Sequence, residues 1–323
     1  MKIEKNGNGE TVWTLRRDWR EVVAQRAACW NEGEEYTLDQ VNLSRPESVR
    51  LVWSGGKGPY AVEIGGQHLD VMQNECSVFN LETDREYDWR VTDSNGETVA
   101  GSLKTAYSPR LIGLPDQDNG PANFRDWGGW KTVDGRRLKQ NMVYRGAAPE
   151  LFVPSTEKNL QFLKDVLKIR TDLDLRYETQ VVGRTRSDLG EGVRWIHKPV
   201  NAYNSFTEEQ NRLFAETIRL FADPELYPVF VHCAGGCDRT GEIVFLVQAV
   251  CGLSDEDLFT EYELTSLWAP RPRTIPYLVD WLEKIAAFSN GEQDLRRQVA
   301  AYLEAIGVTA AEQEQIRQNL LED

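Results

Sequence analysis

Hydrophobic and polar residues alternate in short segments over the first third of the chain. The clearest alternating segments are 48–53, 60–64 and 86–91. Turn-forming residues follow them at 54–59, 65–66 and 93–96. Strands of this length and spacing are typical of a small β-sandwich. We therefore predict a small all-β sandwich domain over residues 1–107, in which segment 19–30 fits either a helix or a leading strand.

The hydrophobic period becomes helical after a boundary at 105–110. Helices are predicted at 156–167, at 205–221 with Ser205 or Thr207 as the N-cap, and at 240–252, 255–267, 274–288, 292–306 and 309–322. Short apolar strands are predicted at 171–175 and 229–231. Segment 240–252 is apolar nearly all round, which is typical of a buried central helix. Strands that alternate with helices predict an α/β domain over 108–323, with a parallel or mixed sheet flanked by helices.

Composition limits the possible functions of the chain. Its 323 residues suggest two domains, or one large domain with an appendage, and 41% hydrophobic residues with ten Trp suffice for a sizeable core. The net charge of −14 disfavours a nucleic-acid partner. No run of 18 apolar residues occurs, so we expect no membrane insertion. The first residues do not resemble a signal peptide, so we expect a cytoplasmic protein, with export after signal removal as the alternative. The five cysteines, an odd and sparse set, do not form a disulfide framework and fit a reducing compartment or thiol chemistry.

The strongest candidate chemistry lies between the strand at 229–231 and the helix that starts at Thr240. Residues 232–241 read HCAGGCDRTG. A glycine-containing loop before a helix directs backbone N–H groups and the helix N-terminus at one point, which forms an anion site. The same groups would lower the pKa of Cys233 and make its thiolate a nucleophile. Arg239 can bind two phosphate oxygens, and Thr240 can donate a hydrogen bond to the Cys233 sulfur.

The spacing His-Cys-x5-Arg-Thr resembles the signature of the protein tyrosine phosphatase superfamily. Further stretches resemble a bacterial branch of it: 123–129 (NFRDWGG), 134–136 (DGR), 143–146 (VYRG), 169–176 (IRTDLDLR) and 261–266 (EYELTS). The resemblance implies a cysteine-phosphatase-like fold and hydrolysis of phosphotyrosine, with phosphoserine, phosphothreonine or phosphoinositides as further substrates. It implies a phosphocysteine intermediate and substrate contacts from the loop residues His232, Ala234, Gly235, Gly236, Cys237, Asp238 and Arg239. It implies neither a cofactor nor a metal, and His68 and His197 lack ligand-spaced partners.

Cys237 departs from the branch, which usually has Lys at this position. The missing charge weakens the phosphoinositide interpretation and favours phosphotyrosine, in a phosphorylated protein or a small phosphoester. Cys237 itself is either a small filler or a thiol able to form a disulfide with an oxidised Cys233. An inositol polyphosphate phosphatase and an inactive phosphopeptide-binding module remain as alternatives.

Two residues remain as candidates for the general acid, which protonates the leaving group. Other tyrosine phosphatases take it from an Asp on a mobile loop before the Cys, but residues 190–205 contain no Asp. The resemblance implies Asp238. Asp174 is the alternative because it ends a strand near the same crevice, although it could instead be a structural partner of Arg176 or Arg125. Trp127, Trp130 and Arg125 are candidates for lining the pocket, with a structural ion pair to a nearby carboxylate as an equal alternative for Arg125.

Segment 81–91 (LETDREYDWRV) resembles a corner of fibronectin type III domains, with Arg85 where that pattern usually has Thr. The resemblance covers about residues 36–107. Residues 1–107 contain no candidate catalytic group. We therefore expect an accessory domain that positions or stabilises the catalytic domain, or that binds a partner protein.

Overall fold

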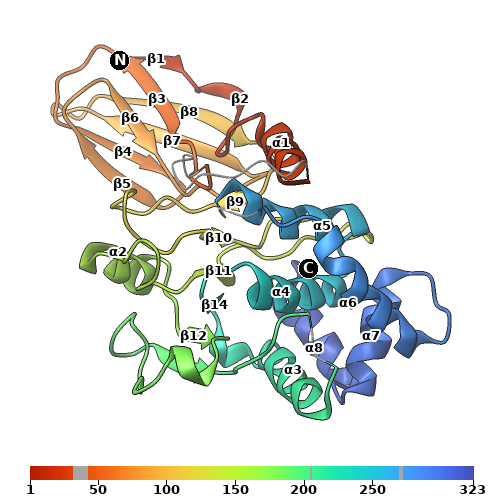
Figure 1. Ribbon diagram of the computed structural model, residues 1–323. Coiled ribbons are helices and arrows are strands. Elements are labelled where there is room, and N and C mark those ends of the chain that lie inside the picture. The colour runs from red at the N-terminus through yellow and green to blue at the C-terminus, as the bar shows by residue number, and fades with distance from the viewer. Residues whose placement is uncertain (32–42, 204–205, 269–271) are drawn as a thin grey trace. The chain divides into compact units, whose positions relative to one another are not determined.

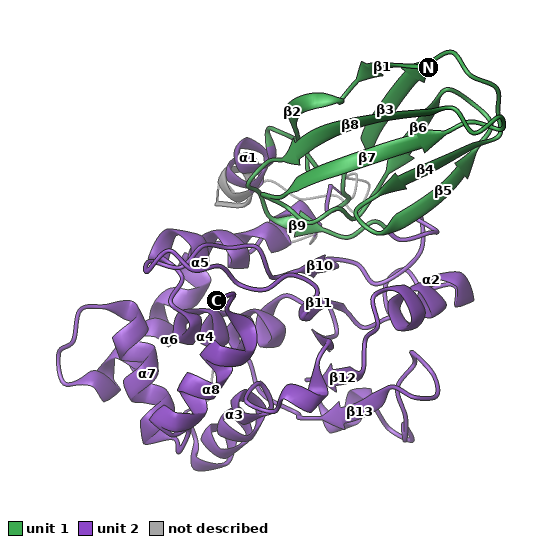
Figure 2. Ribbon diagram, turned by 180° about the vertical axis from the view of Figure 1, so that it is seen from behind, with its two compact units in different colours: residues 1–18, 45–113 green, residues 19–44, 114–323 purple. Residues whose placement is uncertain are grey.

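The computed structural model describes the whole chain except residues 32–42, 204–205 and 269–271 (Figure 1). It divides into two compact units. Unit 1 comprises residues 1–18 and 45–113, and unit 2 comprises residues 19–44 and 114–323 (Figure 2). This division follows residue 113 rather than 107, and it assigns residues 19–44 to unit 2.

Unit 1 contains two β-sheets. Its strands are β1 (Lys2–Lys5), β2 (Asn8–Val12), β3 (Val49–Ser54), β4 (Tyr60–Ile64), β5 (Gln67–Val71), β6 (Glu75–Val78), β7 (Glu86–Thr92), β8 (Thr98–Thr105) and β9 (Arg110–Leu111). One sheet has the order β1-β3-β6 and the other has the order β2-β8-β7-β4-β5. The strands predicted at 48–53, 60–64 and 86–91 are confirmed as β3, β4 and β7, each with bounds within one residue of the prediction.

The alternation that predicts these strands also builds the core of unit 1. In β4 the side chains of Tyr60, Val62 and Ile64 are buried, whereas the intervening two are exposed. Successive side chains of a strand point to opposite faces, so one face enters the core. Strands of both sheets contribute to a single hydrophobic cluster, in which Trp53 of β3 packs edge-on against Tyr60 with ring centroids 5.3 Å apart.

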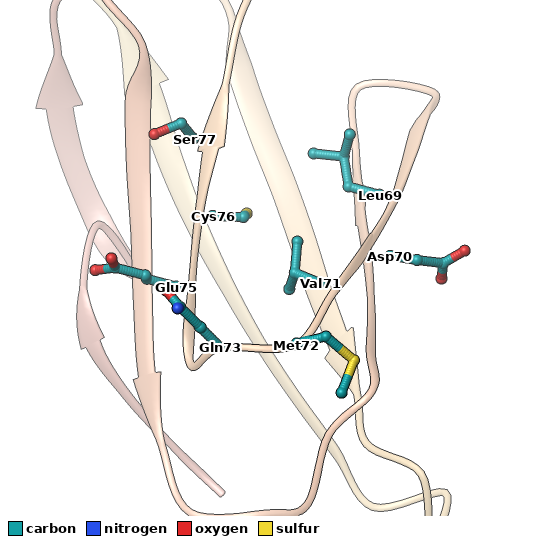
Figure 3. A pocket seen from close by; sticks show the side chains of 8 residues that line it. All are labelled: Leu69, Asp70, Val71, Met72, Gln73, Glu75, Cys76 and Ser77. Carbon is teal, nitrogen blue, oxygen red and sulfur yellow. The ribbon is translucent and has the colours of Figure 1, made fainter.

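A pocket of about 450 Å³ lies beside β5 and β6 in unit 1 (Figure 3). Its lining includes Leu69, Val71, Met72 and Cys76, together with the acidic Asp70 and Glu75. Burial raises the pKa of the Cys76 thiol to about 11, so this thiol is neutral near pH 7. A neutral thiol beside two acidic side chains does not suit a phosphate ester.

Helix α1 (Trp19–Asn31) begins the part of the chain that belongs to unit 2. The helical alternative for segment 19–30 is therefore the one observed. Arg26 of α1 donates hydrogen bonds to the carbonyl oxygens of Ser266 and Leu267, at 2.7 and 2.6 Å. The Leu43 N–H also donates to Leu267 O, at 3.0 Å. These bonds to unit 2 explain why residues 19–44 group with it.

Unit 2 is a mixed sheet with helices. Its strands are β10 (Arg125–Asp126), β11 (Val143–Ala147), β12 (Thr171–Asp174), β13 (Arg194–His197) and β14 (Val229–Cys233). Besides α1, its helices are α2 (Glu157–Gln161), α3 (Glu208–Leu220), α4 (Asp238–Cys251), α5 (Asp255–Glu263), α6 (Pro276–Ala286), α7 (Leu295–Ala305) and α8 (Ala310–Leu320). Shorter helical turns lie at Phe162–Val166, Glu178–Gln180, Pro224–Leu226, Leu264–Leu267 and Ala287–Ser289. Within unit 2 the strand order is β13-β12-β14-β11-β10.

The helices predicted from the hydrophobic period are confirmed, with ends that differ by a few residues. The prediction for 156–167 corresponds to α2 and the π-helical turn Phe162–Val166 that continues it. Thr207 caps α3, because its hydroxyl accepts a hydrogen bond from the Gln210 N–H, and the alternative cap Ser205 lies outside the described residues. Every residue of α4 from Arg239 to Cys251 is buried, which is why this helix lacks a polar face.

Strand β14 lies between β12 and β11 and is parallel to both. In the register of the sheet, Cys233 at the end of β14 is paired with Ala147 of β11, and His232 is paired with Asp174 of β12. The carboxyl ends of three parallel strands therefore meet at one edge, where sheets of this kind usually bind ligands. Along the part of the chain that the structure describes, no helix combines the length and apolar character needed to cross a membrane.

Candidate active site

The loop between Cys233 and Asp238 connects β14 to α4 and turns sharply at Gly236. This glycine has φ +66°, and a Cβ atom there would lie 2.2 Å from the Gly146 carbonyl oxygen. A larger residue would therefore clash with β11 as well as strain the backbone. Gly236 allows the loop to pack against the strand beside it.

The carbonyl groups of the loop face the surrounding protein. The Ala148 N–H donates to the carbonyl oxygens of Cys233 and Ala234, at 3.0 and 3.1 Å. The Gly236 carbonyl accepts from Arg145 Nη2 at 2.7 Å and from Asn123 Nδ2 at 3.0 Å. The N–H of a peptide points opposite to its carbonyl, so the loop N–H groups are directed away from these partners, as in an anion-binding nest.

Cys233 lies at the start of this loop and is almost completely buried. Burial opposes ionisation of the thiol, but the charge of Arg239 and the polar groups of Thr240 outweigh it, so the pKa of Cys233 is lowered. The Thr240 hydroxyl has no hydrogen-bond partner among the described residues, which leaves it available to a Cys233 thiolate. Of the two cysteines in this loop, Cys233 therefore ionises more readily than Cys237.

Arg239 is held from the side opposite the loop. Its Nη1 donates to Gln180 Oε1 at 2.8 Å and to the Leu175 carbonyl at 3.4 Å. Its guanidinium carbon lies 4.3 Å from the centre of the Tyr177 ring. Gln180 is neutral, so this support fixes the guanidinium without cancelling its charge, and the charge stays available to a phosphate.

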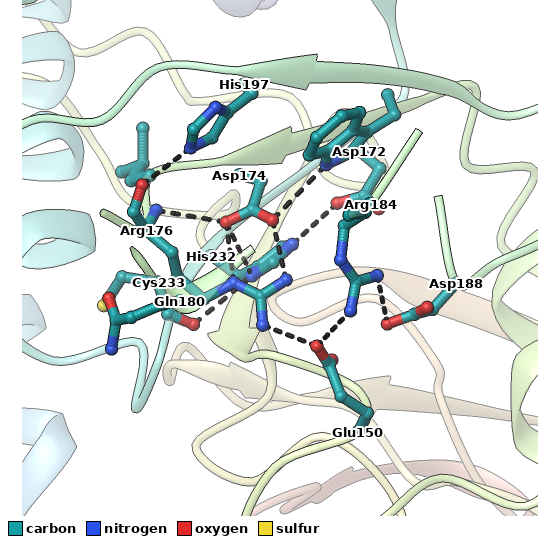
Figure 4. Close-up of polar contacts among 12 residues, drawn as sticks. Glu150, Asp172, Asp174, Arg176, Gln180, Arg184, Asp188, His197, His232 and Cys233 are labelled. Atoms are coloured by element: carbon teal, nitrogen blue, oxygen red, sulfur yellow. Dashed lines mark hydrogen bonds and ion pairs between the residues drawn. The ribbon is translucent and has the colours of Figure 1, made fainter. Parts of the chain in front are cut away.

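His232 is buried beneath the loop between two carboxylates. Its Nε2 lies 2.7 Å from Asp172 Oδ1, and its Nδ1 lies 3.9 Å from Asp174 Oδ1 and 3.3 Å from the Cys233 carbonyl oxygen (Figure 4). Burial favours neutral imidazole, but Asp172 and Asp174 outweigh it and raise the pKa of His232 to about 9. A protonated His232 can donate to both Asp172 and the Cys233 carbonyl, and so fixes the start of the loop.

Stability should fall as pH rises through the titration of His232. The folded protein binds the His232 proton more tightly than the unfolded chain, where the pKa is near 6.5. The stabilisation from this proton is therefore complete below pH 6.5 and is lost as the pH rises past about 9. The shift corresponds to roughly 3 kcal/mol. Urea unfolding of wild type and His232→Gln between pH 6 and pH 9.5 measures this stabilisation. The difference in the free energy of unfolding between the two proteins should shrink as the pH rises, and a constant difference would exclude this linkage.

Asp174 lies in a network of ion pairs that runs from its own buried carboxylate to two partly exposed residues. Its two oxygens accept from Arg176 Nε and Nη2, at 2.9 and 2.7 Å, and Arg176 also contacts Glu150, which contacts Arg184 (Figure 4). Asp174 is completely buried. Burial raises its pKa, but Arg176 and the charge of His232 outweigh this effect and lower it overall. The contacts favour the structural role for Asp174, because a carboxylate that is completely buried in its ion pair cannot reach a substrate to give it a proton.

Asp238, the first residue of α4, lies on the exposed side of the site. Its side chain is 31% exposed and forms an ion pair with Arg273. Burial raises the pKa of Asp238, but hydrogen bonds from Arg273 and Tyr203 outweigh it and lower the pKa overall. Of the two predicted acids, Asp238 is the one that solvent and a substrate can reach.

Cys237, which occupies the usual Lys position, is the residue before α4, and its buried thiol makes no capping hydrogen bond to that helix. Its Sγ donates to the Gly235 carbonyl at 3.2 Å. Burial raises its pKa to about 12, and the nearby Arg273 offsets this effect only in part. Cys237 therefore adds no charge to the loop.

Trp127, Trp130 and Arg125 do not line the site. Both tryptophans are buried, and Trp127 packs on Phe221 with ring centroids 5.5 Å apart. Arg125 Nε donates to Glu261 Oε1 at 2.8 Å, in a buried ion pair that Arg145 joins. Trp127 and Trp130 instead belong to the core, so the prediction that they line the pocket is wrong. For Arg125 the alternative of a structural ion pair with a nearby carboxylate is the one observed.

Two aromatic side chains that were not predicted lie beside Gly235. A Cβ atom on Gly235 would be 3.6 Å from the Trp268 ring and 3.8 Å from the Phe152 ring. The two rings pack edge to face, with centroids 5.2 Å apart. Phe152 is 61% exposed and has φ +62°, an unusual conformation for a bulky residue and one that often marks functional sites. An aromatic residue between two prolines, Pro149 and Pro154, is the sequence signal that could have indicated this position.

The strand–loop–helix anion site with an ionisable cysteine defines a cysteine-based phosphate-binding fold. A sequence profile described as "Tyrosine phosphatase family" matches residues 118–322, and the chain belongs to this family. A curated Cupriavidus necator protein, named provisionally as a tyrosine-protein phosphatase, is 23% identical over 171 residues. That match covers 44% of this chain and 59% of the relative, so the chain spans about three fifths of the relative's length.

Solved structures with some similarity include two of the Siw14 catalytic core. The core catalytic domain of the PP-IP phosphatase SIW14 from S. cerevisiae, in complex with citrate, is 18% identical with a TM-score of 0.33. The match covers 47% of this chain and 94% of that chain. A second Siw14 catalytic core, also 18% identical, has a TM-score of 0.32 and covers 46% and 92% of the two chains. Similarity this low does not bear on the substrate.

Proposed function

We propose that the chain hydrolyses phosphate monoesters through a phosphocysteine intermediate, with phosphotyrosine as the preferred substrate class. The position of Cys233 carries the first part of this proposal: it ends β14 at the start of the anion-binding loop that leads into α4, where the charge of Arg239 favours its thiolate. The family assignment supports the same chemistry.

The reaction has two displacements at phosphorus. The Cys233 sulfur forms a bond to phosphorus while the bond from phosphorus to the ester oxygen breaks, and Asp238 gives its proton to that oxygen. Water then attacks the phosphocysteine, Asp238 accepts a proton from the water, and Cys233 leaves as a thiolate. The loop N–H groups and Arg239 stabilise the charge on the phosphate oxygens in both steps.

Phe152 and Trp268 support an aryl ester rather than a serine phosphate or an inositol phosphate. Their rings lie beside Gly235 of the loop, where the group attached to a bound phosphate would leave the site. An aromatic ring there can pack on these side chains, and such a contact is worth about 0.5–1.5 kcal/mol beyond its buried area. The neutral Cys237 offers no charge to a second phosphate.

Substrate preference is tested by comparing a phosphotyrosine peptide, a phosphoserine peptide and inositol hexakisphosphate in one assay. We expect the highest kcat/KM for phosphotyrosine. Phe152→Ala should lower kcat/KM for phosphotyrosine and leave that for phosphoserine nearly unchanged. If inositol hexakisphosphate is preferred, the substrate class is wrong but the mechanism stands; if no ester is hydrolysed, the phosphopeptide-binding alternative gains support.

Asp238→Asn should slow poor leaving groups more than good ones. Phenolate needs a proton from the acid, whereas p-nitrophenolate leaves readily without one. We expect kcat for phenyl phosphate to fall about 10²-fold and kcat for p-nitrophenyl phosphate to fall much less. Equal losses for both esters would assign Asp238 a structural role.

For unit 1 we propose a fibronectin type III-like sandwich that acts as an accessory domain and binds a partner protein. The Tyr87 hydroxyl accepts from the Glu82 N–H at 2.8 Å, which resembles the tyrosine corner of such sandwiches. The acidic pocket beside β5 and β6 is unsuited to phosphate. We propose that catalysis takes place in residues 108–323.

A further inference from the structure

Three donors surround the carboxylate of Asp238. Oδ1 accepts from the Tyr203 hydroxyl at 2.7 Å and from Arg273 Nε at 2.5 Å. Oδ2 accepts from Arg273 Nη2 at 2.9 Å. The donors come from two segments far from Asp238 in sequence, one between β13 and α3 and the other after the turn Leu264–Leu267.

Tyr203 contacts two acidic residues that are one turn apart on α4. Besides its bond to Asp238, its backbone N–H donates to Glu242 Oε1 at 2.7 Å. Its hydroxyl also lies 2.5 Å from the Tyr262 hydroxyl. Tyr203 has φ +59°, a conformation that costs energy for a non-glycine residue and persists when the surroundings impose it.

Glu242 accepts from Tyr203 without adding a second negative charge. Its side chain is completely buried, and burial raises its pKa well above the usual value. Its Oε2 has no partner among the described residues. A protonated Glu242 can therefore hold the Tyr203 backbone beside Asp238 without repelling the Asp238 carboxylate.

Arg273 is fixed by its own backbone and by an aromatic ring. The Ser266 hydroxyl accepts from the Arg273 N–H and donates to the Arg273 carbonyl, each at 3.0 Å. Its guanidinium carbon lies 5.2 Å from the centre of the Tyr277 ring. The side chain is 16% exposed, so water screens its ion pair with Asp238 only in part.

We propose that Tyr203 and Arg273 are positioning residues that act on the reaction through the carboxyl group of Asp238. The proposal rests on the proposed function, in which Asp238 is the general acid. Both residues stabilise the carboxylate, which is the form that accepts a proton from water in the second step. Both therefore oppose the protonated form that the first step requires.

The consequence is a shift in pH dependence. Asp238 is also faced by Arg239 and Glu242 from α4, by Cys233 from β14 and by Tyr262 from α5. These groups remain when Tyr203 or Arg273 is replaced. Loss of a donor should therefore let Asp238 keep its proton to higher pH, and the alkaline limb of kcat for a poor leaving group should move upward.

The test measures kcat against pH for phenyl phosphate and for p-nitrophenyl phosphate. The variants are Tyr203→Phe and Arg273→Gln, with Arg273→Lys as the charge-restoring variant. Tyr302→Phe is the matched control, since it removes a tyrosine hydroxyl on α7 that contacts Asn211 and not Asp238. For phenyl phosphate we expect an upward shift of roughly 1–3 pH units in Arg273→Gln, a smaller shift in Tyr203→Phe, a partial return in Arg273→Lys and none in Tyr302→Phe.

A purely structural role would lower kcat for both esters at every pH and leave the limb in place, and that result would overturn the proposal. Tyr203→Phe removes a single oxygen atom, so it keeps the test valid if Arg273→Gln does not fold. Failure of the proposed function is distinguishable, because Asp238→Asn would then slow both esters equally. If Asp238→Asn acts selectively and the limb does not move, only the positioning role is wrong.

Discussion

Cys233→Ser is expected to reduce hydrolysis of p-nitrophenyl phosphate by roughly 10⁴-fold or more. A serine hydroxyl is hardly ionised near neutral pH, and Arg239 and Thr240 stabilise a thiolate that the variant lacks. The loop N–H groups and Arg239 remain, so binding of inorganic phosphate should persist. Steady-state kinetics and a phosphate competition assay measure the two effects.

Two controls make this result specific. Cys76→Ser, in unit 1, should retain wild-type turnover because that thiol is remote from the loop in sequence and neutral. EDTA should leave wild-type activity unchanged, since the mechanism uses no metal. Turnover near the wild-type rate in Cys233→Ser, or its loss with EDTA, would exclude a cysteine nucleophile.

Arg239→Ala is expected to reduce kcat on the order of 10³-fold and to weaken phosphate binding. The guanidinium is able to bind two phosphate oxygens at once, and Gln180 and Tyr177 hold it in position. Arg239→Lys keeps the charge but not the planar pair of donors, so it should recover only a small part of the loss.

Arg212→Lys is the matched control for the arginine replacements. Arg212 is 62% exposed on α3 and pairs with Glu216 on the same helix, so its replacement should not affect kinetics. If Arg239→Lys kept full activity, charge alone would suffice, and the two-bond contact would be unnecessary.

The phosphate-binding loop could be predicted from the sequence because it is local. Strand, glycines, cysteine, arginine and helix start all lie within residues 229–241, so no tertiary contact is needed to recognise them. The buried strand β11 was missed as a strand because all five of its residues, including Arg145, are buried and no alternation is visible. Strand β1 was missed for the opposite reason, since three of its four residues are exposed.

The surroundings of the loop depend on topology and could not be predicted. Asp174 and Arg176 are two residues apart, so their pairing was foreseen as one alternative. Asp238 and Arg273 are 35 residues apart, and only the fold brings them together. Tyr203 is likewise 35 residues from Asp238, and only the fold brings its hydroxyl to the Asp238 carboxylate.

The central claim is that Cys233 carries the phosphoryl group during turnover. The most direct measurement is peptide mass spectrometry of the full chain after rapid acid quenching with a phosphotyrosine peptide. We expect a phosphoryl group on the peptide that contains Cys233 in the wild type, more of it in Asp238→Asn if hydrolysis of the intermediate becomes limiting, and none in Cys233→Ser. A phosphoryl group on another residue, or turnover with no phosphorylated Cys233 at any quench time, would contradict the account.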